Sequence, residues 1–193
     1  MKFNSLGLAA GIGVVLLLAV GCSFEKEERD YSIPVKICDV AVEESMVKPL
    51  LPPGGSLKEG RQSMGRTPGE GEQCTLDVDK KIGLTIKISR QFKGRVDALE
   101  AVDRFSNLKR IPLGGNFTSA AVADDGAVAW LQCIPKSGQH LTESAAGVKY
   151  KALVLELFVE NGGEGPENTE QQHKDIDKFV RSYVPGVEKL WCE

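Results

Sequence analysis

The sequence is poor in histidine, in aromatic side chains and in motifs that carry chemistry. Only His140 and His173 are present, and Phe, Trp and Tyr together make up 6% of the residues. A hydrolase triad needs a nucleophile, a base and an orienting acid, so one of these histidines would have to be the base. Both lie in polar, turn-like or helical surroundings, and no Gly-x-Ser-x-Gly elbow accompanies them. We therefore expect solvated surface histidines and predict no catalytic residue.

An excess of positive charge is also lacking. The chain carries 24 Lys and Arg against 27 Asp and Glu, which gives a net charge of −3. Nucleic-acid binding needs a basic face, so no nucleic-acid partner is expected. The sequence holds no phosphate-binding loop, dinucleotide fingerprint or calcium loop, and no cofactor is predicted. Asp124 and Asp125 precede Gly126, a pattern typical of a hairpin turn rather than of a carboxylate site.

The N-terminus is uncharged over a long stretch. Lys2 precedes a charge-free run from Ser5 to Gly21 whose second half is strongly apolar. A short positive start, an apolar centre and small residues are the layout of a secretory signal. The run lies at the short edge of the roughly 17–25 residues that a transmembrane helix needs.

The four residues Ala19-Val20-Gly21-Cys22 resemble a bacterial lipobox, although Ala19 stands where leucine is usual. That resemblance implies removal of residues 1–21 and acylation of Cys22, which would hold the protein on the outer face of the cytoplasmic membrane. An ordinary cleaved signal and an uncleaved anchor are the alternatives. In all three interpretations, the same domain is exported.

Five cysteines are an odd number for an exported protein until Cys22 is assigned to the lipid. The other four form an even set, which in an oxidising compartment indicates two disulfides. Three pairings are possible, and we favour Cys38 with Cys74 and Cys133 with Cys192 because each pair closes one half of the chain. No two of these cysteines have the spacing of zinc ligands, so no metal site is predicted.

Residues 22–36 are predicted to be a polar tether, and residues 37–193 a single extracytoplasmic α+β domain. Apolar and polar residues alternate at 74–78, 84–90, 117–123, 127–134 and 149–160, which predicts an antiparallel sheet of about five strands. Helical periodicity predicts two or three covering helices, at about 40–51, 96–107 and 170–183, the last one ended by Pro185. Residues 54–72 are expected to form a long surface loop.

Two further groups of side chains have simple structural explanations. The cationic residues of the first predicted hairpin are expected on its outward, solvated face, with contact to an anionic surface as the alternative; they are Lys80, Lys81, Lys87, Arg90, Lys93 and Arg95. Trp130 and Trp191 are expected to pack against the disulfide of Cys192.

The order of Ile33-Pro34, Cys38, Leu50-Leu51-Pro52-Pro53-Gly54, a Cys-bearing strand, Ala127-Val128-Ala129-Trp130 and a final helix closing on a Cys resembles uncharacterised secreted lipoproteins of actinobacteria. This resemblance implies an envelope location and no established activity. We expect a non-enzymatic domain that binds an envelope ligand or protein. An envelope hydrolase or accessory enzyme with an unrecognised site, and a small-ligand carrier with a pocket between sheet and helices, are the alternatives.

Overall fold

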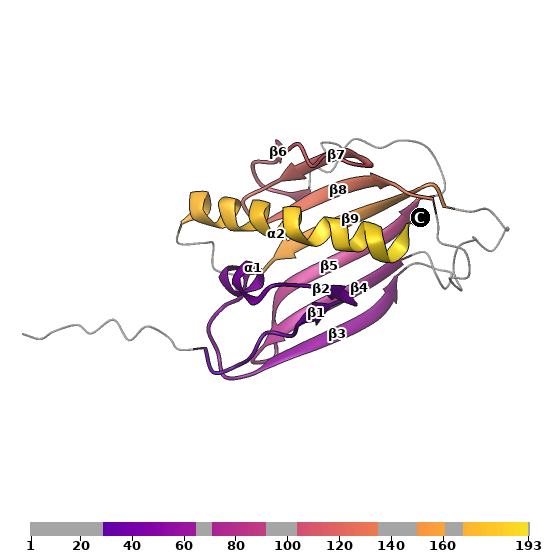
Figure 1. The fold of residues 1–193 in the computed structure, drawn as a ribbon. Helices are drawn as coiled ribbons and strands as arrows, with labels where there is room; N and C mark the ends of the chain where they lie inside the picture. Colours follow the sequence, from indigo (N-terminus) through magenta and orange to yellow (C-terminus); the bar gives the residue numbers. More distant parts are fainter. Residues whose placement is uncertain (1–28, 65–70, 92–103, 135–149, 161–167, 193) are drawn as a thin grey trace, which may run out of the picture.

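The computed structural model describes residues 29–64, 71–91, 104–134, 150–160 and 168–192. These residues form a seven-stranded antiparallel sheet in the order β3-β4-β5-β9-β8-β7-β6, with a separate two-stranded hairpin, β1–β2 (Figure 1). The predicted α+β class with an antiparallel sheet is confirmed, although the sheet has seven strands rather than about five. The strands are β1 (Lys36–Ile37), β2 (Val40–Ala41), β3 (Leu57–Met64), β4 (Gly71–Val78), β5 (Lys81–Gln91), β6 (Lys109–Arg110), β7 (Phe117–Val122), β8 (Gly126–Gln132) and β9 (Ala152–Val159).

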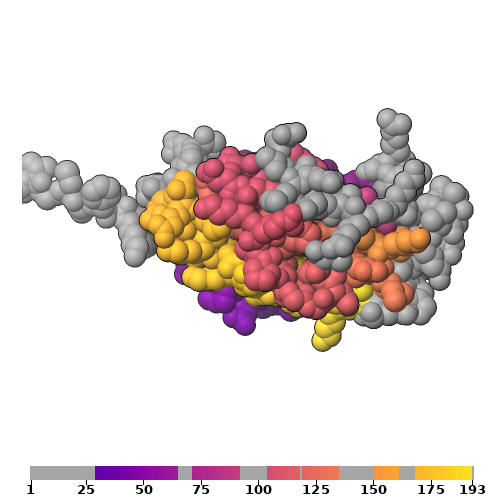
Figure 2. Space-filling model, turned by 90° about the horizontal axis from the view of Figure 1, so that it is seen from above, coloured from indigo at the N-terminus to yellow at the C-terminus, as the bar shows by residue number. Residues whose placement is uncertain are grey.

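One face of the sheet, here called the inner face, is covered by a long helix, α2 (Thr169–Trp191), and by the β1–β2 hairpin with a short helix, α1 (Glu44–Val47). Alternate residues of β5 and β9 point into this layer, as period-2 strands require. Figure 2 looks down on the β6–β7 side of the molecule, where α2 lies beside that edge and Arg181 donates to the Pro112 carbonyl. The main core includes Leu84, Ile86, Ile88, Leu153, Leu155, Leu157, Ile176, Phe179 and Tyr183.

Helix α2 begins as predicted but does not end at Pro185. Asn168 is the N-cap, and its side chain accepts a hydrogen bond of 3.0 Å from the Gln171 amide. The helix continues through Pro185 to Trp191, because the apolar stripe continues with buried Val184, Val187 and Trp191. Proline removes one backbone bond, but Pro185 faces solvent, where a helix can bend away from its core.

The prediction of a surface loop at residues 54–72 is wrong for residues 57–64, which form β3. This strand pairs along its whole length with β4, from Leu57 opposite Val78 to Met64 opposite Gly71. Its sequence, LKEGRQSM, has almost no apolar residue. β3 forms the border of the sheet and is only partly covered, so the alternation that marks buried strands is absent.

The helix predicted from about 40 to 51 starts later. Cys38 and Asp39 both have positive φ, 52° and 65°, and they form the two-residue turn of the β1–β2 hairpin. This turn type twists with the strands that it joins. Asp39 is therefore a turn residue of the hairpin. The helical part is limited to α1 and the following 3-10 turn, η1 (Lys48–Leu50).

Two disulfides, Cys38–Cys74 and Cys133–Cys192, join the body of the domain, in the pairing that we favoured. Within the described ranges, no helix has both the length and the apolar character needed to cross a bilayer. Most of the helix predicted at 96–107 lies outside the described residues. Residues 105–107 are described and are not helical, because Asn107 has a positive φ of 56°, so the predicted helix is wrong there. Phe105 is buried on the outer face of the sheet and stacks on Phe158 at 4.9 Å between ring centroids.

Candidate functional site

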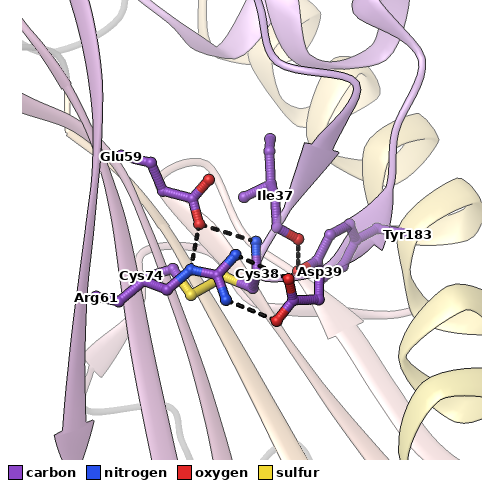
Figure 3. A network of polar contacts seen from close by, with 7 residues as sticks. All are labelled: Ile37, Cys38, Asp39, Glu59, Arg61, Cys74 and Tyr183. Atoms are coloured by element: carbon purple, nitrogen blue, oxygen red, sulfur yellow. Dashed lines mark hydrogen bonds and ion pairs between the residues drawn. A yellow bond between two sulfur atoms is a disulfide. The ribbon is translucent and has the colours of Figure 1, made fainter.

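A network of polar contacts lies where the β1–β2 hairpin meets β3 and β4 (Figure 3). The Cys38–Cys74 disulfide links the hairpin turn to the middle of β4, with 6.0 Å between the two Cα atoms. A cysteine rarely adopts positive φ, and such strain persists only where surrounding contacts fix the backbone. Here the disulfide and a hydrogen bond of 3.3 Å from the Cys38 amide to Glu59 Oε1 fix it.

Arg61 forms ion pairs with two carboxylates in this network, those of Glu59 and Asp39. Its Nε donates to Glu59 Oε1 at 2.7 Å, and its Nη1 and Nη2 donate to the two Asp39 oxygens at 2.6 and 3.2 Å. The fork of the guanidinium matches a carboxylate in this bidentate way. The hydrogen bonds from Arg61 lower the pKa of Asp39, and those to Asp39 and Glu59 raise the pKa of Arg61. Both groups are therefore charged over the whole physiological range.

This cluster has the composition of a structural ion-pair network that joins two segments of the chain. Two carboxylates face one guanidinium, so the cluster does not attract an anion. The ligand atoms of Cys38, Glu59 and Cys74 lie within 4.8 Å of one another, but both sulfurs are used in the disulfide. A metal would require two free thiolates. We therefore assign Arg61 the role of holding the hairpin on the sheet.

A tyrosine of α2 completes the contact from the other side. The Tyr183 hydroxyl donates to the Ile37 carbonyl at 3.1 Å, and the side chain is 1% exposed. Burial raises the pKa of this hydroxyl, so it remains a donor at any physiological pH. The hairpin is thus tied to β3, to β4 and to α2.

Arg90 does not lie with the other cations of the first long hairpin. It stands opposite Leu153 on the inner face and is 5% exposed. Its guanidinium lies 4.5 Å from the Trp191 ring centroid and 5.7 Å from that of Tyr150. Burial lowers its pKa. The prediction of one outward cationic face is wrong at Arg90, because two aromatic rings there give the cation a buried surface on which to stack.

The other cations and the two tryptophans are also separated. Lys87 lies on the outer face, 4.7 Å from the Phe158 ring centroid, whereas Lys93 and Arg95 are outside the described residues. Trp191 packs in the core that contains both Cys133 and Cys192. Trp130 pairs with Val154 on the outer face and is not part of that core, so its expected packing against the disulfide is not observed.

Asp124 and Asp125 organise a turn, as their sequence predicted. Asp125 accepts from the amide and the hydroxyl of Ser106, at 3.0 and 3.2 Å. Asp124 accepts from the Asn107 side chain at 2.5 Å. These bonds join the β7–β8 turn to the segment before β6.

His173 is less exposed than we expected and lies beside this turn. Its Nδ1 is 3.7 Å from Asp124 Oδ1, and the side chain is 21% exposed. The nearby Ser106 hydroxyl donates to Asp125 and not to His173. A triad needs the hydroxyl bonded to the imidazole, so these residues are not arranged as one. His140 lies outside the described residues, as does Cys22.

A buried acid marks the centre of the outer face. Glu156, on β9, is 6% exposed and forms an ion pair with Arg104. It stands between Lys87 of β5 and Val128 of β8 in the register of the sheet. A buried carboxylate needs such a partner, so this pair has a structural explanation.

Sequence reasoning missed the Arg61 cluster completely. The available signal was the spacing of Glu59 and Arg61, which share one face if residues 57–64 form a strand. Asp39 could not be added from sequence, because its approach depends on a hairpin that folds over the sheet. No family model, curated protein or solved structure matches this chain.

Proposed function

We propose that this chain is a membrane-anchored extracytoplasmic lipoprotein whose domain binds a ligand or protein of the cell envelope without catalysing a reaction. The proposed location is supported by the pairing of the cysteines. Four of the five cysteines are used in two disulfides, which leaves Cys22, directly after three small or apolar residues. Disulfides persist in oxidising compartments, and a lipidated Cys22 accounts for the fifth cysteine.

The same proposal places the chain with the uncharacterised secreted lipoproteins of actinobacteria that its sequence resembles. A lipoprotein head carries more than one acyl chain, which is enough for stable anchoring. The cytoplasmic membrane is then the first partner of the protein, reached through the N-terminus.

Mass spectrometry of the protein extracted from membranes tests the anchor. We expect a mature N-terminus at an acylated Cys22, and a Cys22→Ala variant that is no longer processed in this way. A mature chain that begins at an unmodified residue, or that still begins at Met1, contradicts the lipid.

For binding, the border strand β3 is the surface that we favour. Among the described strands, it forms one end of the sheet order, so one row of its backbone N–H and C=O groups lacks a strand partner. Such an edge can accept an extended peptide as an additional strand. Lys58, Arg61 and Gln62 are exposed along it and would flank the added strand.

Photo-crosslinking in the producing cells tests this surface. A photoreactive amino acid in place of Gln62 is expected to give a discrete adduct with an envelope protein. The matched control is the same amino acid in place of Lys174, which is exposed on α2 and not on the edge strand. Adducts from the Lys174 position alone would contradict binding at β3.

One observation keeps an envelope hydrolase as the alternative. Asp124 lies 3.7 Å from His173 Nδ1 and donates its amide to the Ser106 carbonyl, although the Ser106 hydroxyl donates to Asp125. A hydrolase of this type would react with a fluorophosphonate at Ser106 and would lose that reaction in a His173→Gln variant. We expect no labelling of the wild-type protein.

A further inference from the structure

We infer that one end of the domain faces the bilayer and contacts anionic phospholipid headgroups. This end, called here the tether end, consists of residues 51–56, the Asp79–Lys80 turn, and the exposed side chains of Lys58, Lys81 and Ile82. The inference rests on the proposed lipid anchor, and it adds the orientation of the domain and the chemistry of its membrane contact.

The first described residues are fastened to the tether end. Arg29 Nη2 donates to the Leu51 carbonyl at 2.7 Å, and the Asp30 amide donates to the Gly54 carbonyl at 2.9 Å. The Tyr31 hydroxyl donates to the Pro52 carbonyl. The chain therefore joins the body at residue 29, and in Figure 1 this point and the C-terminus lie at opposite ends of the molecule.

The short reach of the chain before Arg29 limits how the domain can stand on the membrane. Seven chain steps separate Cys22 from Arg29, and a fully extended chain covers at most about 25 Å in that distance. Strand β5 has 11 residues, which corresponds to a length of about 36 Å. The tether is therefore too short for the domain to stand upright with its far end on the bilayer.

The tether end carries side chains suited to a headgroup layer. Lys58, Lys80 and Lys81 are exposed, and Ile82 is one of the few large apolar residues exposed in the described chain, at 41%. Lys58, Asp77 and Ile82 stand side by side across β3, β4 and β5. Lysines beside an apolar side chain suit an interface in which the ammonium groups meet phosphates.

Two acids of this end, Asp79 and Glu160, are engaged within the protein, whereas Asp30 is exposed. The Asp79 carboxylate accepts from the amides of Gly55 and Ser56 and from the Ser56 hydroxyl, at 2.8 to 3.0 Å. Glu160, at the end of β9, accepts from the Thr85 hydroxyl at 3.1 Å. Hydrogen bonds hold these charges in place, whereas the lysines extend into solvent.

Lysine footprinting tests the orientation without altering the protein. The mature protein with acylated Cys22 is reconstituted into vesicles that contain phosphatidylglycerol, and labelling by an amine-reactive ester is compared with that in detergent by mass spectrometry. Lys151 is the internal control, because it is exposed and lies at the far end, where its amide donates to the Gln91 carbonyl.

We expect labelling of Lys80 and Lys81 to fall several-fold on vesicles, while labelling of Lys151 is unchanged. Protection of Lys151 instead, or no protection at either end, overturns the orientation. If the protein does not float with the vesicles, the anchor itself is wrong and the orientation is overturned with it. The flotation result thus separates failure of the anchor from failure of the inference.

Charge reversal tests the lipid contact. A lysine close to an anionic surface contributes about fivefold to partitioning. Lys81→Glu removes this attraction and adds a repulsion, so it should reduce the protection of Lys80 by at least about fivefold, whereas Lys151→Glu should not. Equal protection of Lys80 in both variants, or protection that persists on vesicles of phosphatidylcholine alone, overturns the contact with anionic headgroups.

Discussion

Gly186 is the residue through which α2 approaches the β1–β2 hairpin. A Cβ atom at this position would lie 2.4 Å from Cγ1 of Val40. Gly186→Ala gains up to about 1 kcal/mol in helix propensity, but overpacking costs about 1–3 kcal/mol. We expect a net loss of stability in urea denaturation.

The control for Gly186→Ala is a Val40→Ala background. Truncation of Val40 removes the clashing methyl groups, so the same substitution at Gly186 should stabilise that variant. A stabilising effect in both backgrounds would contradict the steric role of Gly186.

Asp79 makes the tether end sensitive to acid. Hydrogen bonds from the Gly55 amide and then from Ser56 lower the pKa of its carboxyl. A carboxyl whose pKa is lower in the folded state stabilises the fold above its unfolded pKa, and this contribution is lost as the pH falls through the folded pKa. Asp79→Asn should therefore lower the free energy of unfolding at pH 7, and the difference should shrink below about pH 4.

Denaturation curves at a series of pH values check this expectation. Asp30→Asn, an exposed aspartate at the same end, is the control and should have little effect at any pH. A loss in Asp79→Asn that is independent of pH would assign the effect to the shape of the turn rather than to the charge.

At the scale of the elements, α2 contains an interior proline. The helix continues past this proline because its buried apolar stripe also continues. Pro185 is exposed, so Pro185→Ala removes no packing and restores a backbone donor to the helix. The gain in helix propensity of up to about 3 kcal/mol is reduced by the greater freedom of the unfolded chain. We expect the variant to unfold at a higher temperature.

Lys178→Ala, two turns earlier on the exposed side of α2, is the control for Pro185→Ala and should change the melting temperature little. A lower melting temperature for Pro185→Ala would show that the helix needs a bend at this position.

The elements that the sequence predicted well are those that pattern and local chemistry determine together. The helix predicted from residue 170 begins one residue earlier, with Asn168 as its cap, and Leu84, Ile86 and Ile88 alternate in a strand that is buried on one face. β3 was missed because a border strand does not need that alternation. Arg90 was misplaced because its polarity was given more weight than its position two residues after Ile88, which puts it on the inner face.

At the scale of the whole molecule, the two disulfides close separate parts of the fold. Each closes a loop, with sequence separations of 36 and 59 residues. In the chain-entropy treatment either one is worth about 4 kcal/mol. Cys38→Ala/Cys74→Ala and Cys133→Ala/Cys192→Ala should each lower the free energy of unfolding by about that amount.

Thiol titration provides the companion measurement. The mature protein, denatured without reductant, should show no free thiol, and each double variant should show none either. Two or more free thiols in the wild-type protein would contradict the two closed bridges, whereas a single free thiol would be that of Cys22 and would contradict its acylation.

The candidate site could not be predicted from the sequence, because its contacts form only in the folded molecule. The cysteine count indicated two bridges and favoured their pairing, since each pair lies within one half of the chain. The Arg61 cluster joins two segments 22 residues apart, and the Tyr183 bond joins residues 146 apart. Such contacts follow from strand order and helix placement, which the local pattern of residues does not determine.

The position of β9 has a consequence for how the chain folds. β9 is the last strand in sequence and the middle strand of the sheet, between β5 and β8. Before residues 152–159 are in place, β3–β5 and β6–β8 can form only two separate small sheets, each with an open edge where β9 belongs. Closure of the sheet is therefore a late and non-local step, and a chain arrested before residue 150 would expose both edges to proteases and chaperones.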